Sequence, residues 1–125
     1  MQLVTEETRS TLQQHHPEAL QELDHLAASL DASSIDPELM ELCRAFFASS
    51  LRGDAFSPNR ELSELETDCL AMCEQFMVSV STMSEEQVAA LARHLGADDL
   101  YVLMYAVYLL EMSERLNLML KGMMQ

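Results

Sequence analysis

The stretch that decides the fold is Leu100-Tyr101-Val102-Leu103-Met104-Tyr105-Ala106-Val107-Tyr108-Leu109-Leu110, the longest uncharged apolar run in the chain. It is too short to cross a membrane, because a transmembrane helix needs about 20 apolar residues. A helix that is apolar nearly all round is instead typical of the centre of a bundle. We therefore expect a helix from Asp98, as its N-cap, to about Lys121, with the other helices packed around it.

Two helix-start signals precede this run. The sequence Ser84-Glu85-Glu86-Gln87 has the pattern of a capping box, in which the first and last side chains satisfy each other's free backbone amides. It predicts a short helix that ends at His94-Leu95-Gly96. Ser57-Pro58 combines an N-cap residue with a proline suited to the first helical position, and predicts a longer helix to about Val80.

The N-terminal half shows the same kind of signal. Asp36-Pro37 predicts a helix to about Leu51, after which Gly53 is suited to a left-handed position that ends it. Pro17 predicts a helix to about Leu30, and residues 1–16 indicate a weak helix or an arm whose order depends on docking. No alternating strand pattern of useful length occurs. The prediction is a single all-α domain over residues 1–125, a bundle of five to six helices around the apolar C-terminal one.

Composition limits the classes of partner. The chain has 21 acidic and seven basic residues, a formal net charge of -14, and the basic residues are scattered. A cationic surface for phosphates is missing, so we expect no nucleic-acid binding and no attraction to anionic membranes. The N-terminus lacks the pattern of a secretory signal, and three cysteines are an odd number for a disulfide framework. We expect a cytoplasmic protein with reduced thiols and no cofactor.

About two thirds of the chain, from Asp36 to Leu120, carries a family resemblance. The segments that carry it include Asp36-Pro37-Glu38-Leu39-Met40-Glu41-Leu42-Cys43-Arg44, Cys69-Leu70-Ala71-Met72-Cys73-Glu74-Gln75-Phe76 and Met83-Ser84-Glu85-Glu86-Gln87-Val88-Ala89-Ala90-Leu91. In these it resembles the carboxymuconolactone decarboxylase and alkylhydroperoxidase-like (AhpD-like) family. The resemblance implies an all-α fold of helical hairpins that pack into dimers, trimers or hexamers.

The redox motif of that family is missing. Active members carry a glutamate about a dozen residues before a Cys-x-x-Cys, with a histidine four residues after the second cysteine. With Glu41 as that glutamate, the two cysteine positions hold Gly53 and Phe56, and the histidine position holds Arg60. The relay that would activate a thiolate is therefore absent in this register.

A second register fails as well. With Cys73 as the second cysteine, the first cysteine position holds Leu70 and the histidine position holds Met77. We therefore expect a diverged, non-catalytic AhpD-like protein that acts by association. Its role would be that of a homo-oligomer (a dimer or trimer), a companion subunit of an enzyme, or a small-ligand-binding module.

Cys69 and Cys73 lie one helical turn apart on an otherwise apolar face, which favours core packing. Two other interpretations stay open. In the first, a thiol oxidoreductase or decarboxylase-like enzyme uses both cysteines together with Glu74. In the second, Met77 extends the same line of sulfur atoms and the face binds a soft metal such as Cu(I).

Two further sets of residues are candidates. Glu74 and Arg115 are expected on neighbouring helices, and we predict a partly buried ion pair between them. The second set is a group of tyrosines and methionines of the last helix, which are candidates to line a cavity or an interface. Its members are Tyr101, Tyr105, Tyr108, Met112 and Met119, with Met123 and Met124 beyond them. For the methionines, ordinary filling of gaps in the packing and a frayed helix end is an equally good interpretation.

Overall fold

The chain forms six helices in the part that its computed structural model describes, residues 1–78 and 84–123. No strand occurs within these two ranges, which confirms the predicted all-α fold. The last helix is by far the longest, at 27 residues. In chain order the helices are α1 Glu6–His15, α2 Pro17–Asp31, α3 Pro37–Leu51, α4 Glu64–Val78, α5 Glu85–Ala92 and α6 Ala97–Met123.

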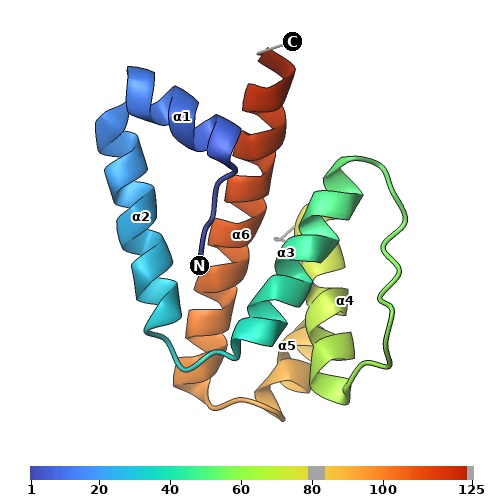
Figure 1. Cartoon of the computed structure of the whole chain (residues 1–125). Coiled ribbons are helices and arrows are strands. Elements are labelled where there is room, and N and C mark those ends of the chain that lie inside the picture. The colour runs from blue at the N-terminus through green and yellow to red at the C-terminus, as the bar shows by residue number, and fades with distance from the viewer. Residues whose placement is uncertain (79–83, 124–125) are drawn as a thin grey trace.

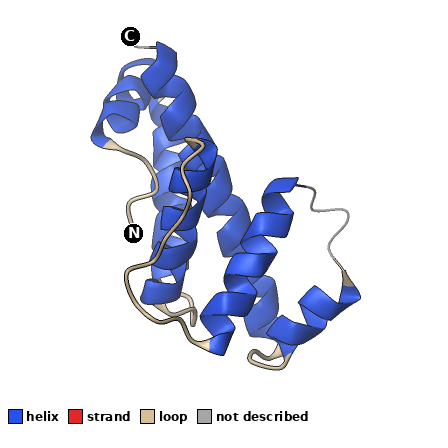
Figure 2. Ribbon diagram, turned by 90° about the vertical axis from the view of Figure 1, so that its right-hand side faces the viewer, coloured by secondary structure: helices blue, strands red, loops and turns tan. Residues whose placement is uncertain are grey.

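Helix α6 runs the height of the molecule, with α1 and α2 on one side and α3, α4 and α5 on the other (Figure 1). Contacts join α6 to α1, α3 and α5, while α2 packs on α1, and α4 packs on α3 and α5. Figure 2, the side view, shows the α4–α5 pair at the edge opposite the N-terminus. The predicted packing around the C-terminal helix is therefore confirmed for α1, α3 and α5.

The N-terminal segment is docked along the body of the protein. Residues 1–5 lie between α2 and α6, with Leu3 and Val4 buried in the core (Figure 1). The amino group of Met1 pairs with Asp31 at the end of α2. The segment is therefore held by the burial of two apolar side chains and by one ion pair. This agrees with the expectation that its order depends on docking.

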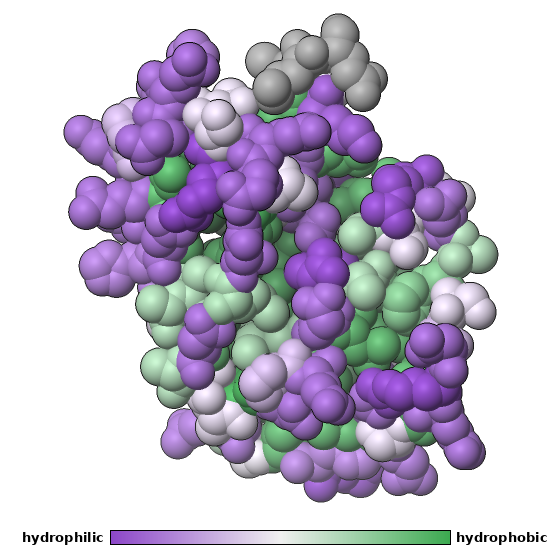
Figure 3. All heavy atoms as spheres, viewed as in Figure 1, coloured by the Kyte–Doolittle hydropathy of each residue, from purple (hydrophilic) through white to green (hydrophobic). Residues whose placement is uncertain are grey.

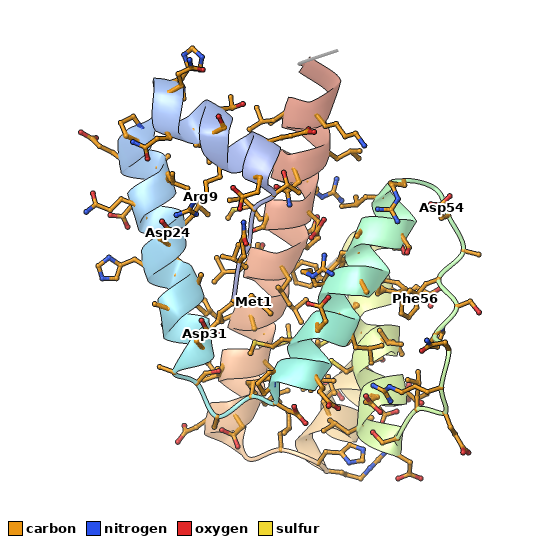
Figure 4. The ribbon with its side chains drawn as sticks, in the orientation of Figure 1. Met1, Arg9, Asp24, Asp31, Asp54 and Phe56 are labelled. Carbon is orange, nitrogen blue, oxygen red and sulfur yellow. The ribbon has the colours of Figure 1, made fainter. Side chains whose placement is uncertain are left out.

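Helix α1 is short and polar, and two features stabilise it. Thr5 is its N-cap, and the Thr5 hydroxyl accepts a hydrogen bond from the backbone N–H of Thr8 at 3.2 Å. Arg9 donates to both oxygens of Asp24 on α2, at 2.8 and 2.7 Å (Figure 4). This two-bond contact links α1 to α2.

The starts of α2 and α3 confirm the proline signals. Both helices begin at a proline, and the Asp36 side chain caps α3 by accepting a hydrogen bond from Glu38 N at 2.9 Å. Beyond the end of α3, Gly53 has a φ of 81°, the left-handed conformation predicted for it. The capping box of Ser84 and Gln87 is also present at the start of α5.

Three predicted boundaries are wrong. Helix α5 ends at Ala92, before His94-Leu95-Gly96. Helix α6 begins at Ala97, so Asp98 lies within its first turn and is not the N-cap. Helix α4 begins at Glu64 and not after Ser57-Pro58, while its expected end at Val80 lies outside the described residues.

The late start of α4 has a local cause. Ser63 and Glu66 form a capping box, in which Ser63 N donates to the Glu66 carboxylate at 2.9 Å and Glu66 N donates to Ser63 Oγ at 3.1 Å. Arg60 donates to the same carboxylate at 3.0 Å. Helix α4 therefore begins after the Ser-x-x-Glu cap and not after the earlier proline. The residues before it form a loop, in which Phe56 packs edge-on against Phe46 with 5.7 Å between ring centroids (Figure 4).

The face of the molecule in Figure 3 is largely hydrophilic. Hydrophilic side chains cover much of the face in Figure 3, with apolar atoms emerging between them. Within residues 1–78 and 84–123, none of the helices has the length and apolar character that crossing a membrane requires.

Candidate functional site

The three cysteines of the chain meet in the core. Cys43 comes from α3, and Cys69 and Cys73 come from α4. The Sγ atoms of Cys43 and Cys69 are 3.4 Å apart, and all three sulfurs lie within 4.8 Å of one another. Each cysteine has 0% of its surface exposed, and none is in a disulfide. We call this group the three-thiol cluster.

Helix periodicity and helix packing together build the cluster. Cys69 and Cys73 are four residues apart, so they share the face of α4 that packs on α3. Cys43 lies on the buried side of α3, between Met40 and Phe47 in the sequence pattern. Because α3 and α4 are in contact, the three sulfurs reach one point. The prediction that Cys69 and Cys73 are buried in an apolar core is confirmed.

The thiols set one another's pKa values. Hydrogen bonds from Cys43 and Cys73 lower the pKa of the Cys69 thiol, although burial opposes this effect. The hydrogen bond to Cys69, with burial, raises the pKa of Cys43 well above its ordinary value. Hydrogen bonds to the other two cysteines, and then burial, also raise the pKa of Cys73. The pKa of each thiol therefore depends on the other two thiols of the cluster.

The arrangement lacks the groups that thiol catalysis would need. Among the described residues, the three-thiol cluster contains neither a histidine nor a carboxylate. Glu74, the carboxylate predicted to work with Cys69 and Cys73, is exposed to solvent. A reactive thiol requires an accessible sulfur beside a base or a cation. The cluster instead presents three soft ligand atoms in a water-excluded space.

Sequence reasoning missed one member of the cluster. Cys43 was visible on the apolar face of α3, but only the packing of α3 on α4 brings it to Cys69. Met77, predicted to continue the line of sulfurs, is half-buried and lies one turn beyond Cys73. Among the described histidine, cysteine, aspartate and glutamate side chains, the group that converges contains cysteines alone.

The predicted ion pair between Glu74 and Arg115 is wrong. Arg115 pairs with Glu111 one turn earlier on α6. The partly buried pair between helices is formed by other residues, since Arg44 Nη1 on α3 lies 3.1 Å from the carboxylate of Glu114 on α6. The prediction placed the arginine on the wrong helix, because the rotation of α6 about its axis cannot be read from its own sequence.

The predicted tyrosine and methionine positions form a line along the exposed side of α6. Tyr101 is 77% exposed, and Tyr105, Tyr108, Met112 and Met119 are also exposed. This finding corrects the expectation that α6 is enclosed on all sides. The exposure favours an interface over a cavity lining. The side chains of Met123 and Met124 lie outside the described residues.

A surface hollow of about 360 Å3 lies where the start of α1 meets the ends of α3 and α6. Charges of both signs line it, from Glu114, Arg52 and Lys121. It is one of the surface hollows where a small-ligand-binding role would be sought. The mixed charges define no class of ligand.

Fold and site together define an all-α protein with a buried cluster of three thiols. Comparisons with protein-family models, with curated proteins and with solved structures found no match for this chain. The AhpD-like resemblance therefore stays a prediction.

Proposed function

We propose that the chain functions by association, as a homodimer in which the exposed side of α6 pairs with the same side of a second copy. The observation that carries this proposal is a continuous line of exposed side chains along α6. We call it the α6 stripe. It consists of Tyr101, Tyr105, Tyr108, Met112, Arg115 and Met119.

The spacing of the α6 stripe suits helix pairing. Its members alternate steps of four and three residues, the repeat that keeps one face of a helix against a partner helix. Large apolar side chains in a contiguous exposed patch mark interaction sites on soluble proteins. Tyrosine and methionine are also the types enriched at interfaces, because they bury much area and adapt to imperfect shapes.

Chemical complementarity favours an antiparallel pair. Pairing centred at the level of Leu110 sets Tyr101 opposite Met119 of the second copy and Tyr108 opposite Met112. Sulfur–aromatic contacts of this kind contribute about 0.3–1.5 kcal/mol each. The same register sets Tyr105 opposite Arg115, a cation–π contact. Each contact occurs twice, as an interface with twofold symmetry requires.

The charges on α6 also favour the antiparallel over the parallel pairing of the two helices. In a parallel pair, Arg115 would face Arg115 and Asp98 would face Asp98. In the antiparallel pair, Asp98 lies beside Lys121 of the second copy, and opposite charges meet. Each chain carries a net charge of -14, so the two bodies repel one another at low salt. Added salt screens that repulsion, and we expect it to strengthen the dimer.

Substitution within the α6 stripe tests the association. Tyr101→Asp introduces a charge at a position that is 77% exposed, so the monomer is expected to fold normally. Light scattering after size-exclusion chromatography should give a dimer mass for the unchanged chain and a monomer mass for this variant. Val88→Asp, at an exposed apolar position of α5, is the matched control and should remain dimeric.

Cross-linking tests the direction. Chains with Tyr101→Cys and chains with Met119→Cys should form disulfides with each other when mixed, and neither should do so with itself. Self-cross-linking of Tyr101→Cys would overturn the antiparallel arrangement. A monomer mass for the unchanged chain across salt concentrations would overturn the homodimer, and the α6 stripe would then be assigned to a companion protein.

Two predictions from the sequence belong to the same proposal. The AhpD-like resemblance implies a protein that assembles through helical hairpins, which agrees with association as the function. We also propose a reducing, cytoplasmic location, supported by three free thiols in a chain without a disulfide.

A further inference from the structure

We propose that Cys43, Cys69 and Cys73 bind one Cu(I) ion between α3 and α4. This inference rests on the three-thiol cluster and is independent of the α6 stripe. Three ligand atoms from two helices converge at one point, which separates this group from a lone buried cysteine.

The spacing of the sulfurs suits one shared ion. With metal–sulfur bonds of about 2.3 Å, three sulfurs in a plane around one ion lie about 4.0 Å apart. The separation between Cys43 Sγ and Cys69 Sγ is 3.4 Å, and no pair in the cluster exceeds 4.8 Å. The required spacing lies between the 3.4 Å found for one pair and the 4.8 Å limit that holds for every pair. Small rotations of the three side chains therefore complete the site without moving either helix.

The ligand set selects a soft ion with few ligands. Thiolate sulfur favours Cu(I) and Zn(II), whereas Mg2+ and Ca2+ require oxygen ligands. Structural zinc sites take four ligands in a tetrahedron. The cluster supplies three sulfurs, and among the described residues neither a histidine nor a carboxylate joins them. Three-coordinate Cu(I) fits this set better than Zn(II).

The binding step balances without a redox change. Because the thiolate is the metal ligand, binding forms three Cu–S bonds, breaks the three S–H bonds and releases three protons to solvent. The copper enters and remains as Cu(I), and no electron is transferred.

Burial predicts slow exchange of the ion. All three cysteines are fully buried, so Cu(I) reaches the sulfurs only when α3 and α4 separate locally. Once bound, the ion joins the two helices and stabilises the folded state, because only the folded state holds the three sulfurs together and so binds the ion more tightly. We therefore expect slow release of copper to a chelator and a higher melting temperature.

The test is an anaerobic titration of the purified chain with Cu(I), in competition with a coloured Cu(I) chelator. One ion per chain should be retained, and X-ray absorption should find three sulfur neighbours at about 2.3 Å. Cys43→Ala, Cys69→Ala and Cys73→Ala should each lose that ion, with circular dichroism to verify that each variant remains helical. Met77→Leu is the matched control and should retain copper.

Several results would overturn the site. They are copper removed completely by the chelator, two sulfur neighbours instead of three, retention by a folded Cys43→Ala variant, or preferential uptake of Zn(II) from a mixture. The Tyr101→Asp variant separates this proposal from the dimer, because it should be monomeric and still retain one copper per chain.

Discussion

Asn117, near the end of α6, accepts a hydrogen bond from the backbone N–H of Thr5 at 3.0 Å, across 112 positions of sequence. Its Nδ2 donates to the backbone carbonyl of Leu3 at 3.3 Å. One buried amide thus satisfies both a donor and an acceptor of the N-terminal segment. Polar backbone groups that fold against a core need such partners, which makes Asn117 the anchor of residues 1–5.

Asn117→Ala removes both hydrogen bonds and leaves two backbone groups unpaired. We expect a loss of about 1–3 kcal/mol in the free energy of unfolding. Hydrogen exchange should become faster at Leu3, Val4 and Thr5, while α3 and α4 stay protected. Asn59→Ala, at an exposed asparagine of the loop before α4, is the control and should change stability by less than about 0.5 kcal/mol. Equal effects of the two substitutions would contradict the anchoring role.

Arg44 joins α3 to α6 through Glu114, which is mostly buried, and it also pairs with Glu41 on its own helix. Arg44→Met should cost about 1–2 kcal/mol of folding free energy, because Glu114 would be left without its cation. Urea unfolding measures this. Arg52→Met removes the exposed pair with Asp54 and should have almost no effect. A stable Arg44→Met variant would show that apolar packing alone fixes α3 on α6.

The capping box of α4 makes stability depend on acid. The hydrogen bond from Arg60, followed by those from Ser63, lowers the pKa of Glu66 from 4.5 to about 2. Because the pKa in the folded state is lower than in the unfolded state, Glu66 contributes its full stabilisation above about pH 4.5. That contribution is lost as the pH falls from 4.5 towards 2.

A matched pair isolates this effect from the other acidic groups of the chain. The difference in unfolding free energy between the unchanged protein and Glu66→Gln should shrink as the pH falls through that window. Glu85→Gln, at an exposed position in the first turn of α5, should show a smaller change. A constant difference between pH 6 and pH 2.5 would refute the assignment.

Gly53 provides a test of backbone conformation. With a φ of 81° and open space around its Cα, Gly53→Ala should destabilise the protein through backbone strain alone, by about 1–2 kcal/mol. Gly122→Ala, in the last turn of α6, should instead be neutral or stabilise by up to about 1 kcal/mol, since alanine favours helix. The melting temperature of Gly53→Ala should therefore be lower than that of the unchanged chain. The melting temperature of Gly122→Ala should be the same or higher.

The burial of the thiols predicts their reactivity. In the native protein without copper, all three cysteines should react slowly with a thiol reagent at neutral pH, and all three should react at once after denaturation. Mass spectrometry counts the labels. Rapid labelling of Cys69 or Cys73 in the folded state would favour the thiol oxidoreductase interpretation and contradict the inert core.

Much of the fold could be predicted because its signals are local. A proline after a capping residue starts α3, the capping box of Ser84 starts α5, and a left-handed glycine follows α3. The predicted start of α4 was wrong, although the sequence contains the correct signal. Ser63-Glu64-Leu65-Glu66 carries a capping box, and the prediction used the earlier Ser57-Pro58 signal instead.

The sequence by itself determined the helices and the sides on which their apolar residues lie, because caps, prolines and helical spacing act over a few residues. Only the tertiary structure decided which distant residues meet. In the folded chain the Cys43 sulfur lies next to that of Cys69, Arg44 forms an ion pair with Glu114, and the tyrosines of α6 are exposed. These outcomes depend on how each helix is rotated and shifted against its neighbours, which the packing of the whole core sets and no single segment encodes.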